Sequence, residues 1–120
     1  MNIAFDGLDG VISSLEEKAG EIIEKAERGI ALGGKEVEGE AKALCPVSTE
    51  ETRPGGPHGE LRQSITSQPD GLTCDIGTNK EYAMYVEFGT YKMKAQPYLV
   101  PSLKNKEDDV IDIIKDAING

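Results

Sequence analysis

The side chains best suited to nucleophilic catalysis in this 120-residue chain are a thiol and an imidazole, Cys45 and His58. They flank a stretch rich in proline and glycine, a loop composition that could bring them together. Covalent catalysis needs a nucleophile beside a base that a third group orients. The sequence identifies no such third group, and a lone histidine in a loop of this kind is more often solvated. We therefore expect no catalytic dyad here.

Metal and phosphate sites have equally weak support. A structural zinc site needs four ligands, often in close pairs, whereas Cys45, Cys74 and His58 give three ligands without paired spacing. Gly34-Lys35 lacks the following hydroxyl residue of a phosphate-binding loop, and it lies within a helical pattern. We expect two reduced, partly buried cysteines, no metal and no cofactor.

Glu87 is the carboxylate with the most unusual setting, because Val86 and Phe88 bracket it. A carboxylate among apolar neighbours can hold a proton and act as a general acid. Pairing with a basic group is the commoner arrangement, and Arg62 or Lys92 is available for it. We therefore favour a structural ion pair and predict that the chain is not an enzyme.

Composition limits the class of protein further. Hydrophobic residues make up 38% of the chain and charged residues 29%, the range of a soluble globular protein. The net charge of −9 disfavours tight binding to duplex DNA, which needs lysine and arginine to displace counterions. No apolar run approaches the ~20 residues of a membrane span, and the acidic start lacks the features of a secretion signal. We expect a single domain over residues 1–120, made in a cytoplasm.

The first half of the chain reads as a helix followed by a loop. Apolar residues at steps of three and four predict an amphipathic helix over residues 8–44. Gly33 and Gly34 weaken its middle, so the pattern fits one long helix or two in line, and Pro46 ends it. Residues 46–60 contain three prolines and three glycines, which predict a loop. A loop of this length is usually functional or mobile.

The second half begins with strands. Alternating residues predict a β-hairpin over residues 61–77, with strands 61–67 and 72–77 joined by a turn at 68–71.

Two further helices complete the expected fold. Thr78 and Glu81 match a capping box for a short helix over residues 79–88, and Gly89 ends it before an extended arm. An apolar stripe predicts a C-terminal helix over residues 98–118. The expected fold class is α+β: a long N-terminal helix and a C-terminal helix packed on a small antiparallel β-sheet, with a short helix between.

Several short motifs follow one another in a set order over most of the chain, from about residue 8 to the end. They are a proline after the long helix, a Gly-x-Leu-Arg-x-Ser-Ile strand, a Tyr-Ala…Glu-Phe-Gly-Thr segment, and a Pro-aromatic-Leu-x-Pro run before the last helix. In this order they resemble the gene-product-ten-like tail-component, or neck, proteins of long-tailed bacteriophages and prophages. His58 replaces the usual threonine, and Tyr98 replaces the usual phenylalanine. The matching residues are Pro46, Gly59, Leu61, Arg62, Ser64, Ile65, Tyr82, Ala83, Glu87, Phe88, Gly89, Thr90, Pro97, Tyr98 and Pro101.

The resemblance implies a non-enzymatic structural protein of the virion, located at the head–tail connector, the neck or the upper end of the tail. It implies assembly in the host cytoplasm as a homo-oligomeric ring that docks to neighbouring connector, head-closure and tail proteins. DNA would pass through the ring without specific binding and without any membrane being involved. Acidic side chains facing the channel would then repel the DNA and keep it mobile.

The residues suggest two structural roles within this picture. We expect Tyr82, Glu87, Phe88 and Tyr98 to fix the fold. An aromatic and methionine-rich run is typical of protein contacts, and the candidate interface residues are Tyr91, Lys92, Met93 and Lys94. The alternatives are a tail-assembly chaperone absent from the virion, a bacterial protein-interaction module, and a small hydrolase that uses the thiol and imidazole described first.

Overall fold

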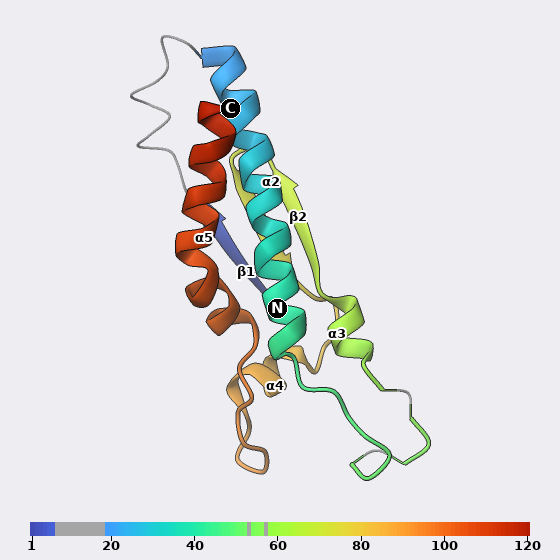
Figure 1. Ribbon diagram of the computed structural model, residues 1–120. Coiled ribbons are helices and arrows are strands. Elements are labelled where there is room, and N and C mark those ends of the chain that lie inside the picture. The colour runs from blue at the N-terminus through green and yellow to red at the C-terminus, as the bar shows by residue number, and fades with distance from the viewer. Residues whose placement is uncertain (7–18, 53, 57) are drawn as a thin grey trace.

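The computed structural model describes residues 1–6, 19–52, 54–56 and 58–120. Two long helices, α2 (Ala19–Leu44) and α5 (Leu99–Asn119), lie side by side over one face of a three-stranded sheet (Figure 1). The expected α+β class, with two long helices on a small antiparallel sheet, is confirmed. The remaining elements are β1 (Asn2–Asp6), α3 (Glu60–Ser64), β2 (Thr66–Asp70), β3 (Thr73–Gly77) and α4 (Ala83–Phe88).

Helix α2 is continuous from residue 19 to residue 44, so the alternative of two helices in line does not hold for this part of the chain. Ala26, Ile30, Val37 and Ala41 are fully buried and form the stripe that faces the core. The helix ends just before Pro46, as predicted. The first part of the predicted helix, up to residue 18, lies outside the described residues.

Two glycines in the middle of α2 allow its neighbours to approach closely. A Cβ atom at Gly33 would lie 2.9 Å from Cγ1 of Val110 in α5, and one at Gly34 would overlap Sγ of Cys74 in β3. Each glycine costs about 1 kcal/mol of helix propensity relative to alanine. The close packing on two sides offsets that cost, which explains why the helix continues through both positions.

The sheet has the order β1-β3-β2, and both pairings are antiparallel. In the central strand, Cys74 and Ile76 are fully buried against the helices, whereas Asp75 between them is exposed on the opposite face. Strand β1 was not predicted. It pairs with β3 along its whole length, from Asn2 opposite Gly77 onward, so residues from the start of the chain complete the sheet.

The predicted hairpin is present, but its first strand begins later than expected. Residues Glu60–Ser64 form helix α3, so the prediction of a strand from residue 61 is wrong. Leu61 and Ile65 are both buried, and their spacing of four fits one face of a helix as well as one face of a strand. The spacing of these two residues therefore does not distinguish a helix from a strand, and in the folded chain both are buried from a helical turn.

The hairpin turn is also displaced along the chain. The strands end at residue 70 and resume at residue 73, so Gly71, with a φ of 61°, lies in the connection. Pro69 lies inside β2, opposite Cys74, rather than in the turn. A proline is tolerated there because β2 is an edge strand, whose outward side needs no N–H donor.

Helix α4 is shorter than the predicted range of 79–88, and the expected capping box does not form. Thr78 is buried at the end of β3, where its Oγ1 accepts the N–H of Lys80 at 3.1 Å and bonds the Ser64 hydroxyl. Tyr82 occupies the N-cap position instead. The last helix, α5, agrees with its predicted range to within one residue at each end.

The glycines of α2 provide a matched test of close packing. We expect the double substitution Gly33→Ala/Gly34→Ala to lower the free energy of unfolding by roughly 1–3 kcal/mol, because both new methyl groups overlap neighbouring atoms. The control Gly20→Ala/Gly39→Ala adds methyl groups that meet nothing within 4 Å, so it should raise stability through helix propensity. Urea unfolding measures both, and equal effects of the two pairs would contradict the packing argument.

Candidate partner-binding surface

Glu87 is buried on the inner face of α4, with 2% of its surface exposed. Its carboxylate accepts three backbone N–H groups, from Tyr98 at 3.0 Å, Leu99 at 2.8 Å and Val100 at 3.2 Å. These donors lie at the start of α5, where N–H groups have no partner within the helix and the helix dipole favours negative charge. The predicted ion pair with Arg62 or Lys92 is thus replaced by a cap on the next long helix. The geometry favours the structural interpretation of this carboxylate.

Tyr98 lies directly before α5 and is fully buried in the core, as expected. Burial raises the pKa of its phenol above the usual range. Its hydroxyl has no hydrogen-bond partner among the described residues. The ring therefore contributes to stability through packing, whereas no hydrogen bond offsets the cost of burying its oxygen.

The segment between α4 and α5 forms a closed loop rather than the extended arm that the sequence suggested. We call residues 89–96 the tip loop. Its base is closed by the Gln96 N–H, which donates to the Val86 carbonyl at 2.8 Å. Further out, the backbones of Thr90 and Met93 exchange hydrogen bonds of 2.8 and 3.2 Å. Between them, Tyr91 and Lys92 stand at the turn.

Gly89 allows this loop to fold back on α4. Its φ of 76° favours glycine, and a Cβ atom at this position would lie 2.7 Å from the amide nitrogen of Ala95. The returning chain therefore passes against the glycine backbone. The family signature places glycine where both the dihedral angle and the close approach require it.

The apolar side chains around the tip loop face solvent rather than the core. Of the eleven large hydrophobic side chains exposed in the described residues, six lie between residues 82 and 93. Phe88 is 63% exposed and Tyr91 is 94% exposed, so the expectation that Phe88 fixes the fold is wrong. Exposed aromatic and methionine side chains that are close together in the sequence are typical of protein contacts. We call the following residues the tip patch: Met84, Tyr85, Phe88, Tyr91 and Met93.

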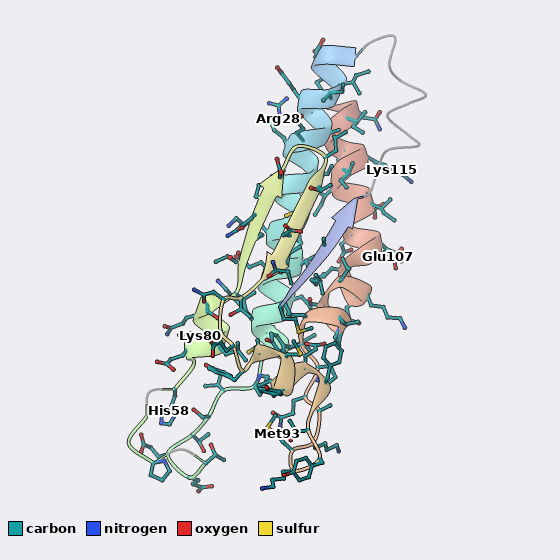
Figure 2. All side chains as sticks on the ribbon, turned by 180° about the vertical axis from the view of Figure 1, so that it is seen from behind. Arg28, His58, Lys80, Met93, Glu107 and Lys115 are labelled. Atoms are coloured by element: carbon teal, nitrogen blue, oxygen red, sulfur yellow. The ribbon has the colours of Figure 1, made fainter. Side chains whose placement is uncertain are left out.

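A hollow of about 320 Å³ adjoins α4 and lies between it and the loop that follows α2. Figure 2 shows that this loop, marked by His58, and the tip loop, marked by Met93, project at the same end of the molecule. Val47, Leu61 and Val86 give the hollow apolar walls. The end of the molecule therefore offers both projecting side chains and a recess.

The loop after α2 is closed by His58 rather than by a catalytic pair. His58 Nδ1 lies 2.7 Å from Ser48 Oγ, and Nε2 lies 2.9 Å from a carboxylate oxygen of Glu50. Glu50 also accepts the Gly55 N–H at 3.0 Å, and its hydrogen bonds with His58 and Gly55 lower the pKa of its carboxyl. Sequence analysis missed Ser48, because a serine in a polar loop carries no distinguishing signal.

Cys45 has none of the properties of a catalytic thiol. Burial raises its pKa to about 11, which keeps it protonated and a poor nucleophile near neutral pH. Its Sγ contacts the Pro46 carbonyl at 3.6 Å, while His58 bonds Ser48 and Glu50 instead. The Ser48–His58–Glu50 order resembles that of a hydrolytic triad, but the Glu50 side chain is 73% exposed and so is poorly placed to stabilise a charged imidazole. We interpret these contacts as loop closure.

The fifteen signature residues are divided between the core and the surface. The buried members are Leu61, Ile65, Ala83, Glu87 and Tyr98. The half-buried members are Pro46, Gly59, Ser64, Gly89 and Pro101. The exposed members are Arg62, Tyr82, Phe88, Thr90 and Pro97. All four candidate interface residues are exposed, namely Tyr91, Lys92, Met93 and Lys94.

Other site types find no support within the described part of the chain. No group of three or more histidine, cysteine or acidic residues there is arranged to hold a metal ion. No helix in the same residues is both long enough and apolar enough to cross a bilayer.

Comparison with known proteins places most of the chain in one protein family. The model of the HK97-gp10-like family, described as "Bacteriophage HK97-gp10, putative tail-component", matches residues 9–89. Neither the curated proteins nor the solved structures gave a significant match.

The Glu87 cap can be tested by removing its acceptor atoms. We expect Glu87→Leu to lower the free energy of unfolding by roughly 3 kcal/mol, because it leaves buried N–H groups without a partner. Glu87→Gln keeps one acceptor oxygen but loses the charge, and should cost about half as much. Urea unfolding gives both values, and a leucine variant as stable as the parent would rule out the cap as a major contribution.

Removing the buried hydroxyl of Tyr98 should not destabilise the fold, in contrast to removing the Glu87 carboxylate. We expect Tyr98→Phe to leave stability unchanged or to raise it by up to about 1 kcal/mol, because the lost oxygen has no partner. Tyr98→Ala should instead lower stability by roughly 3–5 kcal/mol through loss of the buried ring. Thermal and urea unfolding distinguish these outcomes. A phenylalanine variant that loses 2 kcal/mol or more would reveal a hydrogen bond to the hydroxyl.

Proposed function

The chain belongs to the HK97-gp10-like family of bacteriophage tail components, and we propose that it is a structural protein of the head–tail connector, neck or tail-completion region of the virion. In this role it assembles as a ring and docks to neighbouring connector, head-closure and tail proteins. It performs no catalysis and is built into the particle in the host cytoplasm. The tip patch is the observation that supports assembly with other chains most directly.

The tip patch has the physical properties of a preformed contact surface. Its aromatic and methionine side chains stay in water in the single chain, which is unfavourable unless a partner covers them. The tip loop is closed by backbone hydrogen bonds at its base and near its turn, so little conformational entropy is lost when it binds. Exposed aromatic side chains on a closed loop are suited to act as anchors in a partner's recess.

The charge of the chain fits a location beside DNA that must move. A net charge of −9 in each subunit, repeated around a ring, would give a channel with a strongly negative potential. DNA would be repelled by such a wall and would pass without specific binding. This part of the proposal concerns the channel, whereas the tip patch concerns contacts with other chains, which include neighbouring copies of this chain in the ring.

Virion composition and a paired substitution test the proposed function. We expect particles made by a phage encoding the chain to contain it in multiple copies, as measured by mass spectrometry of purified virions. We expect Phe88→Ala/Tyr91→Ala to fold with nearly unchanged stability, because both side chains are exposed. This variant should nevertheless fail to complement a deletion phage, which would accumulate unjoined heads and tails.

The control for this experiment is Leu32→Ala, which removes an exposed apolar side chain (57% exposed) from α2 rather than from the tip. It should complement fully. Virions that lack the chain would indicate a tail-assembly chaperone or another interaction protein instead. Full complementation by the tip variant would show that the tip patch is not the docking surface.

A further inference from the structure

We propose that the tip loop of one subunit binds the acidic outer face of α5 on the next subunit, so that neighbouring copies of this chain meet head to side. The inference rests on the proposed ring assembly and assigns the two surfaces that form its contact. It follows from the charge and apolar character of two separate regions of the same molecule.

The charged side chains of the tip loop, Lys92 and Lys94, are both positive and exposed, whereas the nearest exposed acid in the sequence is Glu81, before α4. Between residues 82 and 98 the charged side chains are Glu87, Lys92 and Lys94, and Glu87 is buried beneath α5. Lys92 Nζ lies 5.4 Å from the centre of the Tyr91 ring, a cation–π contact that holds an ammonium group beside an exposed aromatic face. The tip therefore presents apolar and cationic groups together.

The outer face of α5 has the complementary character. Ile111 is an apolar side chain that is 42% exposed, although it lies in the middle of a helix of charged residues. Asp108 and Glu107 lie three and four residues before it, and Asp112 follows it directly; all three are exposed. Asp109 differs from them, because it pairs with Lys106 at 3.5 Å within the same helix. Lys115, four residues after Ile111, is an exposed basic neighbour on the same face. An isoleucine with exposed acidic groups before it and directly after it in the helix fits an aromatic residue accompanied by lysines.

The two surfaces are too far apart to satisfy one another within one subunit. Asp108 and Asp112 lie about 14 and 20 Å along α5 from its first residue, at a rise of ~1.5 Å per residue. Figure 2 shows Met93 of the tip loop at one end of the molecule and Glu107 on the outer side of α5. A contact between different surfaces of identical chains is heterologous, and repetition of such a contact closes a ring when the rotation permits.

Reciprocal charge reversal tests the pairing. We expect Lys92→Glu/Lys94→Glu and, separately, Asp108→Lys/Asp112→Lys to reduce complementation of a deletion phage about tenfold or more, because each places like charges across the contact. The chain carrying all four substitutions should recover most of the loss. The control Glu24→Lys/Glu27→Lys reverses two exposed acidic residues of α2 and should have no effect. Failure of the fourfold variant to recover, or full activity of either double variant, would overturn the proposal.

Cross-linking in the particle tests the geometry independently. The native cysteines, Cys45 and Cys74, are buried, so cysteines introduced beside the contact as Gln96→Cys and Lys115→Cys, both at exposed positions, should react selectively with a flexible bismaleimide. Virions containing the double variant should give a ladder of covalent oligomers, whereas either single variant should give monomers. Virions that contain the chain but give no ladder would refute this contact and leave the proposed function intact. Virions made with the parent chain that nevertheless lack it would refute the proposed function itself.

Discussion

The structure of α4, the tip loop and the start of α5 depends on the hydrogen bonds that the buried Glu87 carboxylate accepts. It binds the first N–H groups of α5 from the inner face of α4, so it joins two helices that the chain connects through an exposed loop. A charge–dipole contact in a dry environment is stronger than the same contact in water. Tyr98 and Leu99, whose N–H groups it receives, are thereby fixed in the core. The tip loop then spans two anchored points, and its outward residues are held without a core of their own.

A second constraint acts along the length of the molecule, where α2 serves as the central element. Its glycine positions let α5 approach on one side and β3 on another, and the distances leave no room for a methyl group at Gly33 or Gly34. The elongated layer that results has one polar sheet face turned to solvent, with Asp75 near its centre. The two constraints act on different parts of the molecule. The glycine contacts determine how α2 packs on α5 and β3, and the Glu87 cap determines how α4 joins the start of α5.

The sequence was most informative where one periodicity dominates over many residues. The apolar stripe of α5 predicted that helix to within a residue, and the class of the fold followed from two such stripes and a turn sequence. It was least informative over short segments. Leu61 and Ile65 fit a helix and a strand equally well, and β1 has only five residues whose partners lie about seventy positions away. The burial of Glu87 was suggested by its neighbours, but its backbone partners leave no trace in side-chain identity. Phe88 was assigned to the core because it is aromatic, whereas its position on α4 turns it outward.

The order of synthesis gives the Glu87 cap a further consequence. A ribosome produces the carboxylate before the three amides that it binds, since residues 98–100 follow the tip loop in the chain. Until α5 has emerged and folded, α4 and the tip loop lack the anchor that fixes their return path. A chain that ends before residue 98 therefore lacks the donors that hold this return path. The order of the tip region therefore depends on amides that are synthesised after it.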